Sequence, residues 1–239
     1  MKYIYGPVKS RRLGFSLGLS LTPYKVCDFD CVYCQLGETR QTVKERKEYI
    51  PVKEILEELK GWLENNPEEA KSLDYITFSG SGEPTLNIKI ASLISEIKKI
   101  AQIPVAVITN ASLLGDSSIR HELLGADLIV PSLDAVTPEV FSRVDRPHPQ
   151  INIENIIEGL ISLRKEFRGR IWLEVMLVKG VNDDLRHIRK LKSVIEKINP
   201  DKVQLNSPVR ATRESGISCV DNNKLKKIKE ALGGKAEII

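Results

Sequence analysis

Residues 27–34 read Cys27-Asp28-Phe29-Asp30-Cys31-Val32-Tyr33-Cys34, so three of the chain's four cysteines lie within eight residues. The spacing Cys-x3-Cys-x2-Cys supplies three thiolates from one short loop. Cubane iron–sulfur clusters are held by cysteine thiolates, and three of them would leave the fourth iron without a protein ligand. Such an iron is free to bind a small molecule, so the motif predicts a reactive metal centre.

Other common uses of clustered cysteines suit this sequence less well. A structural zinc ion is closed by four ligands, usually from paired Cys-x2-Cys or Cys/His knuckles. Here the fourth cysteine, Cys219, lies far downstream, and the three histidines show no ligand spacing. Bacterial ferredoxins use the different run Cys-x2-Cys-x2-Cys-x3-Cys-Pro. Zinc, or cysteines that only pack in a core, remains the alternative interpretation.

The small number of cysteines also argues against a disulfide framework. A chain of 239 residues with four cysteines and no apolar leader at its first residues is not typical of a secreted, disulfide-rich protein. We therefore expect a cytoplasmic protein with reduced thiols. No stretch approaches the roughly 18 uncharged apolar residues of a membrane span, so we expect no membrane association.

The cysteine motif resembles the signature of the radical S-adenosylmethionine (radical SAM) superfamily, in which an aromatic residue such as Tyr33 precedes the third cysteine. The segment Tyr5-Gly6-Pro7-Val8-Lys9-Ser10-Arg11-Arg12-Leu13-Gly14, followed by Cys-x3-Cys-Val-Tyr-Cys-Gln-Leu-Gly, is similar to one small, largely uncharacterised branch near the wybutosine-synthesis enzymes. The resemblance covers nearly the whole chain. It implies that Cys27, Cys31 and Cys34 hold a [4Fe-4S] cluster whose open iron chelates the amino and carboxylate groups of SAM.

Apolar, β-branched runs alternate with amphipathic stretches about six times, which is typical of βα units and a parallel sheet. We expect strands at residues 15–21, 75–78, 105–109, 128–133, 171–178 and 203–206, and helices at 52–65, 88–100, 151–167, 184–198 and 222–232. Six units with right-handed crossovers predict an α/β fold, namely a partial (β/α)6 TIM-type barrel of parallel strands. The length suits a single domain over residues 1–239, with a cluster loop at 22–40 and a C-terminal cap region at about 207–239.

Chemistry in barrels of this kind collects at the carboxyl ends of the strands. The second expected strand is followed by Ser79-Gly80-Ser81-Gly82-Glu83-Pro84, where glycines let the backbone approach a ligand. The segment resembles the Gly-Gly-Glu-Pro motif of radical SAM enzymes, with Ser81 in place of the first glycine. The resemblance implies that Ser81, Gly82 and Glu83 contact the SAM ammonium group. The alternative is an ordinary βα turn.

Four further strand residues and one loop aromatic are candidate SAM contacts. The Asn110 amide can donate to and accept from ribose hydroxyls, or it can cap a turn. Ser132 and Asp134 share one strand face, and similar positions in the family contact the ribose or the methionyl carboxylate, although Ser132 could equally serve packing. Glu174 inside a barrel is costly unless paired or ligand-bound, so it belongs to the site or to an open edge. Tyr33 either packs in the loop or, as the family implies, helps to seat adenine.

The formal net charge is +4, and several basic residues are expected near the active face. These candidate substrate-rim residues are Arg11, Arg12, Arg143, Arg146, Lys179, Arg210 and Arg213. A basic rim suits an anionic substrate such as a phosphorylated metabolite, a nucleotide or RNA, although few aromatic residues are present for base stacking. Part of the charge could instead balance the SAM carboxylate and the cluster thiolates. Cys219 is either a small hydrophobe or a hydrogen-atom donor or cluster ligand.

The resemblance also implies an activity. An electron from a ferredoxin- or flavodoxin-type reductant would cleave SAM to a 5′-deoxyadenosyl radical, which would take a hydrogen atom from an anionic small molecule or a nucleoside or RNA substrate. At 239 residues, the sequence is shorter than expected for a protein with a separate cobalamin domain or an auxiliary-cluster domain. The alternatives are an activase that acts on the backbone of a glycyl-radical enzyme, and a non-catalytic iron–sulfur or zinc module. We expect a monomer or weak oligomer.

Overall fold

The computed structural model describes residues 1–210 and 212–239, and its strands form one eight-stranded sheet in the order β1 to β8. Seven strands run parallel: β2 (Gly14–Leu19), β3 (Tyr75–Phe78), β4 (Val105–Thr109), β5 (Leu128–Pro131), β6 (Arg170–Met176), β7 (Lys202–Asn206) and β8 (Ala236–Ile238). β1 (Ile4–Ser10) pairs antiparallel to β2. Because strands adjacent in sequence are adjacent in space and β1 does not pair with β8, the predicted partial barrel is confirmed.

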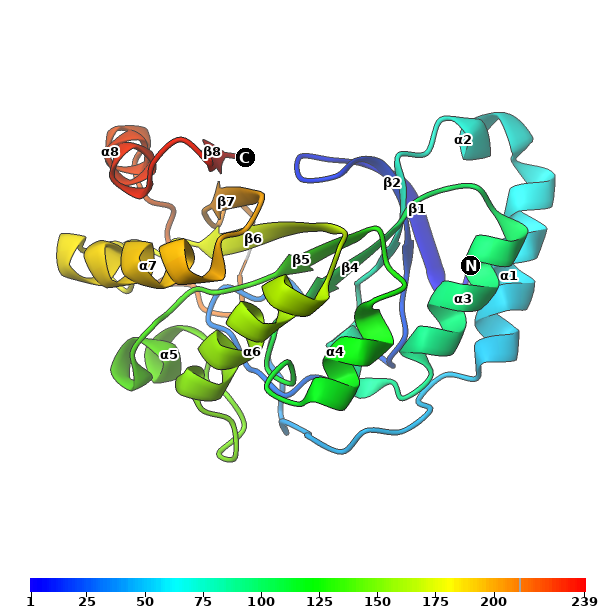
Figure 1. Cartoon of the computed structure of the whole chain (residues 1–239), viewed down its shortest axis with the longest axis horizontal. Helices are drawn as coiled ribbons and strands as arrows, with labels where there is room; N and C mark the ends of the chain where they lie inside the picture. Colours follow the sequence, from blue (N-terminus) through cyan, green and yellow to red (C-terminus); the bar gives the residue numbers. More distant parts are fainter. Residues whose placement is uncertain (211) are drawn as a thin grey trace.

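The helices lie along one side of the sheet (Figure 1). They are α1 (Val52–Asn65), α2 (Pro67–Lys71), α3 (Ile90–Ile100), α4 (Ser117–Leu123), α5 (Pro138–Val144), α6 (Ile153–Glu166), α7 (Leu185–Ile198) and α8 (Asn222–Leu232), with a short 3-10 helix, η1 (Pro84–Leu86). Contacts run in order from α1 to α3, α4, α6, α7 and α8, so the helices form a continuous outer layer. Within the described residues, no helix is long and apolar enough to cross a membrane.

The core lies between this helical layer and the sheet. Every residue of β3 and β5 is buried, as expected for parallel strands covered on both faces. Ile55, Leu59 and Trp62 recur at helical spacing on α1 and are buried, while the charged positions between them face solvent. The apolar side chains therefore hold the helices against the sheet. The polar residues at the strand ends take no part in this packing and are available for a site.

The structure differs from the sequence prediction mainly at the edges of the sheet. β1, β8, α2, α4 and α5 were not predicted. β1 contains Gly6 and Pro7, which usually mark a turn, and proline is tolerated here because β1 is an edge strand. β2, β5 and β6 each end two residues earlier than predicted. These extra residues lie in loops at the carboxyl edge.

The unpredicted β1–β2 hairpin brings the two edges of the barrel together. Its tip lies close to β8 and the C-terminus in Figure 1. The Arg11 guanidinium donates to the carbonyl oxygen of Ile239 at 3.2 Å, and the Gln204 amide donates to the carbonyl oxygen of Arg12 at 3.4 Å. The hairpin tip therefore reaches across the open side of the sheet toward β7 and β8.

Candidate active site

A cavity of about 380 Å³ lies at the carboxyl ends of the central strands. All three cysteines of the predicted cluster loop line it, together with polar residues that follow successive strands. Of the predicted cofactor-binding residues, those in its wall are Tyr33, Gly82, Glu83, Asn110, Ser132 and Glu174. The sequence reasoning missed Tyr5, Ser79, Thr109, Met176 and Asn206, of which Ser79, Thr109 and Asn206 were visible as polar residues at strand ends.

The cluster loop is held against the last residue of α5 and the chain segment that follows it. The Val32 amide donates to the carbonyl of Val144 at 2.9 Å, and the His148 amide donates to the carbonyl of Asp28 at 2.8 Å. Lys25 Nζ donates to Cys34 Sγ at 3.2 Å. The loop that carries the thiols is thus fixed by backbone bonds, which preorganises them.

Burial raises the pKa of the Cys27 and Cys31 thiols well above their usual value, and nearby carboxylates raise it further. Burial therefore favours the neutral form of these two thiols when no metal is bound. Metal coordination removes the thiol proton, because the thiolate is the metal ligand. The loop accordingly has the chemistry of a metal site rather than of a free reactive cysteine.

The three cysteines line one cavity, as the three protein ligands of a cubane cluster with one open iron would. Within residues 1–210 and 212–239, no group of three or more His, Cys, Asp or Glu side chains is arranged to hold one metal ion. A tetrahedral zinc ion needs thiolates that converge to about 2.3 Å from one point, whereas a cubane takes each thiolate on a different iron. Cys219 is exposed and does not line the cavity, so it does not close the set as a fourth ligand.

Glu83 is buried and caps the start of η1, at the end of the loop that follows β3. One carboxylate oxygen accepts bonds from the Thr85 amide, the Thr85 hydroxyl and the Thr109 hydroxyl at 3.0, 2.6 and 2.7 Å. The other accepts only the Asn110 amide, at 2.8 Å, among the residues described. Burial, followed by repulsion from Asp28, raises the pKa of Glu83 to about 7. The second oxygen is therefore the one with capacity for a ligand.

Gly82 lets the β3 loop and the cluster loop touch. A Cβ atom at Gly82 would overlap the carbonyl oxygen of Val26. The same carbonyl accepts the Glu83 amide at 3.1 Å, and the Ser81 carbonyl accepts the Lys25 amide at 2.6 Å. The Ser81 hydroxyl lies 3.1 Å from the Ser20 hydroxyl and is outside the cavity wall.

Asn110 and Ser132 line the cavity after β4 and β5. Asn110 Nδ2 donates to Asp28 at 2.6 Å, and its side-chain oxygen accepts the Ser112 amide at 3.0 Å. Asn110 thus ties the end of β4 to the cluster loop, and it also has the turn-forming contact that the alternative interpretation predicted. The Ser132 amide is bonded to the Thr109 carbonyl at 2.9 Å, which holds its side chain at the cavity.

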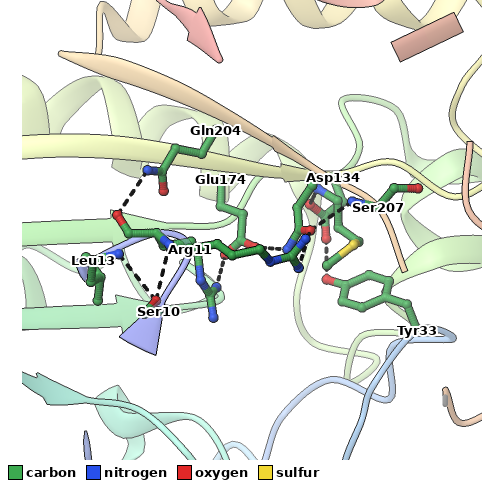
Figure 2. Close-up of polar contacts among 11 residues, drawn as sticks. Ser10, Arg11, Leu13, Tyr33, Asp134, Glu174, Gln204 and Ser207 are labelled. Carbon is green, nitrogen blue, oxygen red and sulfur yellow. Dashed lines mark hydrogen bonds and ion pairs between the residues drawn. The ribbon is translucent and has the colours of Figure 1, made fainter. Parts of the chain in front are cut away.

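Asp134 lies behind Tyr33, outside the wall of the large cavity. The Tyr33 hydroxyl donates to one Asp134 oxygen (Figure 2), and the Met176 amide donates to the other at 2.7 Å. Asp145 lies beside it, and both line a second cavity of only about 10 Å³. Burial raises the pKa of Asp134 to about 7 and that of Asp145 well above its usual range. A direct contact of Asp134 with SAM stays a prediction.

Glu174 lies inside the barrel and is paired, so the open-edge interpretation is wrong. It is 4% exposed, forms an ion pair with Arg12 and accepts a hydrogen bond from Asn206 Nδ2 at 3.0 Å. Figure 2 shows Glu174 facing the hairpin tip that carries Arg11. The pairing offsets part of the cost of burying this charge.

Of the predicted rim residues, only Arg12 lines the cavity. Arg146 pairs with Glu214 at 2.5 Å, and Arg213 lies 3.1 Å from Asp30, 3.3 Å from Glu38 and 2.8 Å from Glu214. Other cations contact neutral groups or solvent: Arg143 bonds the Gly180 carbonyl at 3.3 Å, Arg210 bonds Gln35 at 3.4 Å, Arg11 bonds the Asn206 side chain at 3.3 Å, and Lys179 is exposed. The basic rim is thus partly neutralised.

A partial parallel barrel with a three-thiol loop at its carboxyl edge defines a class of iron–sulfur enzymes. Residues 21–191 match the model of the Radical SAM superfamily, and the chain belongs to that superfamily. Its members are enzymes that use a [4Fe-4S] cluster and SAM, so the predicted family and cofactors are confirmed.

Relatives place the chain in a little-characterised part of the superfamily. It is 43% identical over 229 residues to a protein named GTPase Obg of Brachyspira hyodysenteriae, covering 96% of this chain and 33% of that protein. It is 36% identical over 220 residues to a UPF0026 protein of Methanocaldococcus jannaschii, covering 91% and 67%. The chain thus spans about a third of the first relative's length. The structure of TYW1 with a lysine–pyruvate adduct shares the fold, with a TM-score of 0.69 and 19% identity over 91% of this chain and 72% of that one.

Proposed function

We propose that this chain holds a [4Fe-4S] cluster through Cys27, Cys31 and Cys34, binds SAM beside it, and removes a hydrogen atom from an anionic substrate. The observation that carries the proposal is the shared cavity, whose wall combines the three thiols with polar groups from successive strand ends. The substrate is a small anionic molecule or a nucleoside, the latter free or within RNA. The cavity of about 380 Å³ has the size of a small-molecule site, which the proposal assigns first to SAM.

The residues in the wall have distinct proposed roles. When bound, the cluster and SAM supply one-electron cleavage of SAM and the hydrogen-atom abstraction that follows. The less-bonded oxygen of Glu83 accepts a hydrogen bond from the SAM amino group, while Gly82 keeps the backbone close to it. Asn110 and Ser132 face the ribose, and Tyr33 covers the cluster side of the adenine.

The partners and organisation are proposed on the same basis. A ferredoxin- or flavodoxin-type protein delivers the electron in a reducing, cytoplasmic compartment, where the free thiols remain available for the cluster. One domain covers residues 1–239, with the cluster loop at 22–40 and the cap at 207–239, in which residue 211 lies outside the described residues. The contacts of Arg210 and Arg213 with the cluster loop support this cap. A monomer or weak oligomer is proposed.

Anaerobic reconstitution with iron and sulfide, reduction with dithionite and quantification of 5′-deoxyadenosine test the proposal. Wild-type protein is expected to release 5′-deoxyadenosine from SAM, and Cys31→Ala is expected to release none. A reconstituted wild-type protein with full cluster absorbance and no SAM cleavage would contradict the proposal and favour a non-catalytic module. Deuterium transfer into 5′-deoxyadenosine from a glycine-labelled protein, and not from small anions, would favour the activase alternative.

A further inference from the structure

The tip of the β1–β2 hairpin holds Arg12 in a fixed backbone position. The Ser10 hydroxyl accepts the Arg12 amide at 3.2 Å and the Leu13 amide at 3.3 Å, and Gln204 on β7 donates to the Arg12 carbonyl at 3.4 Å. Figure 2 shows this arrangement around Ser10, Leu13 and Gln204. A turn tied down on both sides can hold a long side chain in a defined direction, which lowers the entropy lost on binding.

The Arg12 side chain points into the cavity and is only partly engaged. It lines the cavity wall, and 32% of its side chain is exposed, against 5% for its partner Glu174. One nitrogen, Nη1, donates to Glu174. Within residues 1–210 and 212–239, Nε and Nη2 have no hydrogen-bond partner. Because a guanidinium carries five N–H donors in a planar fork, several donors remain for a ligand in the cavity.

Glu174 and Asn206 act on Arg12 from the barrel interior. Glu174 takes one guanidinium nitrogen and is itself held by Asn206 Nδ2 at 3.0 Å, while Asn206 Oδ1 accepts Arg11 Nη2 at 3.3 Å. Two arginines and one carboxylate therefore meet here, which leaves a net positive charge of about one beside the cavity. The other cation in the wall, Lys25, already contacts Cys34.

Arg12 is bonded to the β6 and β7 part of the cavity wall, where the proposed SAM contact Ser132 pairs with Glu174, and not to the part around Glu83. Glu83 and Asn110 follow β3 and β4, whereas Glu174 and Asn206 belong to β6 and β7. Neighbouring strands are about 4.8 Å apart, so β3 and β6 are separated by up to about 14 Å along the sheet. The group of SAM that Glu83 holds therefore leaves the N–H groups of Arg12 for another ligand group.

We infer that Arg12 is the substrate anchor and binds an oxyanion, a phosphate or a carboxylate, through its free N–H groups, with Glu174 and Asn206 as positioning residues. The inference rests on the proposed function, since it names the group of the substrate that the same cavity recognises. Paired N–H donors of arginine match the two oxygens of such a group.

Isothermal titration calorimetry on the reconstituted, SAM-bound holoenzyme tests the inference, with inorganic phosphate and acetate as separate probes. Arg12→Gln is expected to weaken the better-bound anion about tenfold or more. Lys227→Gln, which removes the same charge from the exposed face of α8, is the matched control and is expected to leave the affinity unchanged. The stronger of the two probes indicates whether the substrate group is a phosphate or a carboxylate.

Two further variants separate binding from folding. Glu174→Gln removes the neighbouring negative charge but keeps Arg12, so anion affinity is expected to rise, whereas a purely structural ion pair predicts no gain. The double variant R12Q/E174Q avoids an unpaired buried carboxylate, and loss of anion binding in a folded double variant supports the inference.

Three outcomes would overturn the inference: neither anion binds the wild type, R12Q binds the anion as well as wild type does, or R12Q loses SAM instead of the anion. The 5′-deoxyadenosine assay on the same wild-type preparation keeps the two proposals apart. If SAM is not cleaved but anion binding depends on Arg12, the function fails and the anchor stands. If SAM is cleaved and Arg12 has no effect on anion binding, the proposed function stands and the anchor role of Arg12 is wrong.

Discussion

Glu83 illustrates how a single residue combines a structural and a binding task. Its four hydrogen bonds come from two amides and two hydroxyls, and none of these donors carries a charge. A buried carboxylate without a cation is costly, which is why its pKa rises to about 7. A ligand that donates N–H groups would stabilise the ionised carboxylate, so the residue is suited to the SAM amino group.

The raised pKa of Glu83 predicts a pH dependence of SAM binding. The carboxyl group is mostly protonated below about pH 7 and ionised above it, with Asp28 as the neighbouring acid that opposes ionisation. Because the SAM amino group donates to the ionised carboxylate, the SAM affinity of the reconstituted protein should rise between about pH 6 and pH 8. Glu83→Gln should bind SAM about tenfold more weakly, without that rise. Equilibrium dialysis with labelled SAM measures both, and an equal slope in E83Q would assign the pH effect elsewhere.

Gly82 is a residue at which one methyl group should disturb the site. Gly82→Ala places a Cβ against the Val26 carbonyl, which must move and take the cluster loop with it. We expect a loss of about 1–3 kcal/mol in the free energy of unfolding and a lower iron content after reconstitution. Gly216→Ala is the control, because its Cβ would meet nothing within 4 Å. Urea unfolding and iron analysis compare the two variants. Equal stability and equal iron content would show that the β3 loop and the cluster loop need no close approach at Gly82.

At the scale of elements, the cluster loop is held from two sides. The segment after α5 bonds it through the backbone, and Arg213 bonds it through Asp30 and Glu38. Both holding segments were hard to foresee. α5 is only seven residues long, which is too short for a periodic pattern, and the contact of Arg213 with Asp30 joins positions far apart in the sequence.

Arg213→Ala should loosen this arrangement. The side chain is 19% exposed and faces three carboxylates, so its removal leaves partly buried negative charge beside the thiols. We expect the free energy of unfolding to fall by about 1–2 kcal/mol and iron to be lost to a chelator severalfold faster. Arg210→Ala, whose single described side-chain bond spans 3.4 Å, should behave like wild type. The rate of iron loss to a chelator, followed by cluster absorbance, tests this prediction. Similar rates for both variants would contradict a role for Arg213 in holding the loop.

The bounds of the inner strands were predicted closely from the sequence. Their short, continuous apolar runs between amphipathic segments are typical of buried parallel strands. β3 and β4, and helices α1 and α8, have the predicted bounds. The cluster motif and the polar strand ends also pointed to one site. The hairpin of β1 and β2 was not predicted, because Gly6 and Pro7 are typical of a turn. The ion pair of Arg12 with Glu174, which depends on this hairpin, was therefore not predicted either. Long-range ion pairs leave no local pattern in a sequence.

At the scale of the whole molecule, the sheet gathers groups from both ends of the chain around one cavity. The hairpin near the N-terminus contributes Arg12, the loop after β2 contributes the thiols, and β7 near the C-terminus contributes Asn206. The contact of Arg11 with the Ile239 carbonyl joins the two edges. Residues from both ends of the described sheet thus line or flank one cavity.

Electron paramagnetic resonance of the reduced, reconstituted protein, recorded with and without SAM, tests most directly whether the three thiols and the strand ends form one site. We expect the signal of a reduced [4Fe-4S] cluster, a shift of that signal when SAM is added, and loss of the signal in Cys31→Ala but not in Cys219→Ser. A cluster signal that SAM leaves unchanged, or one that survives in Cys31→Ala, would contradict the account.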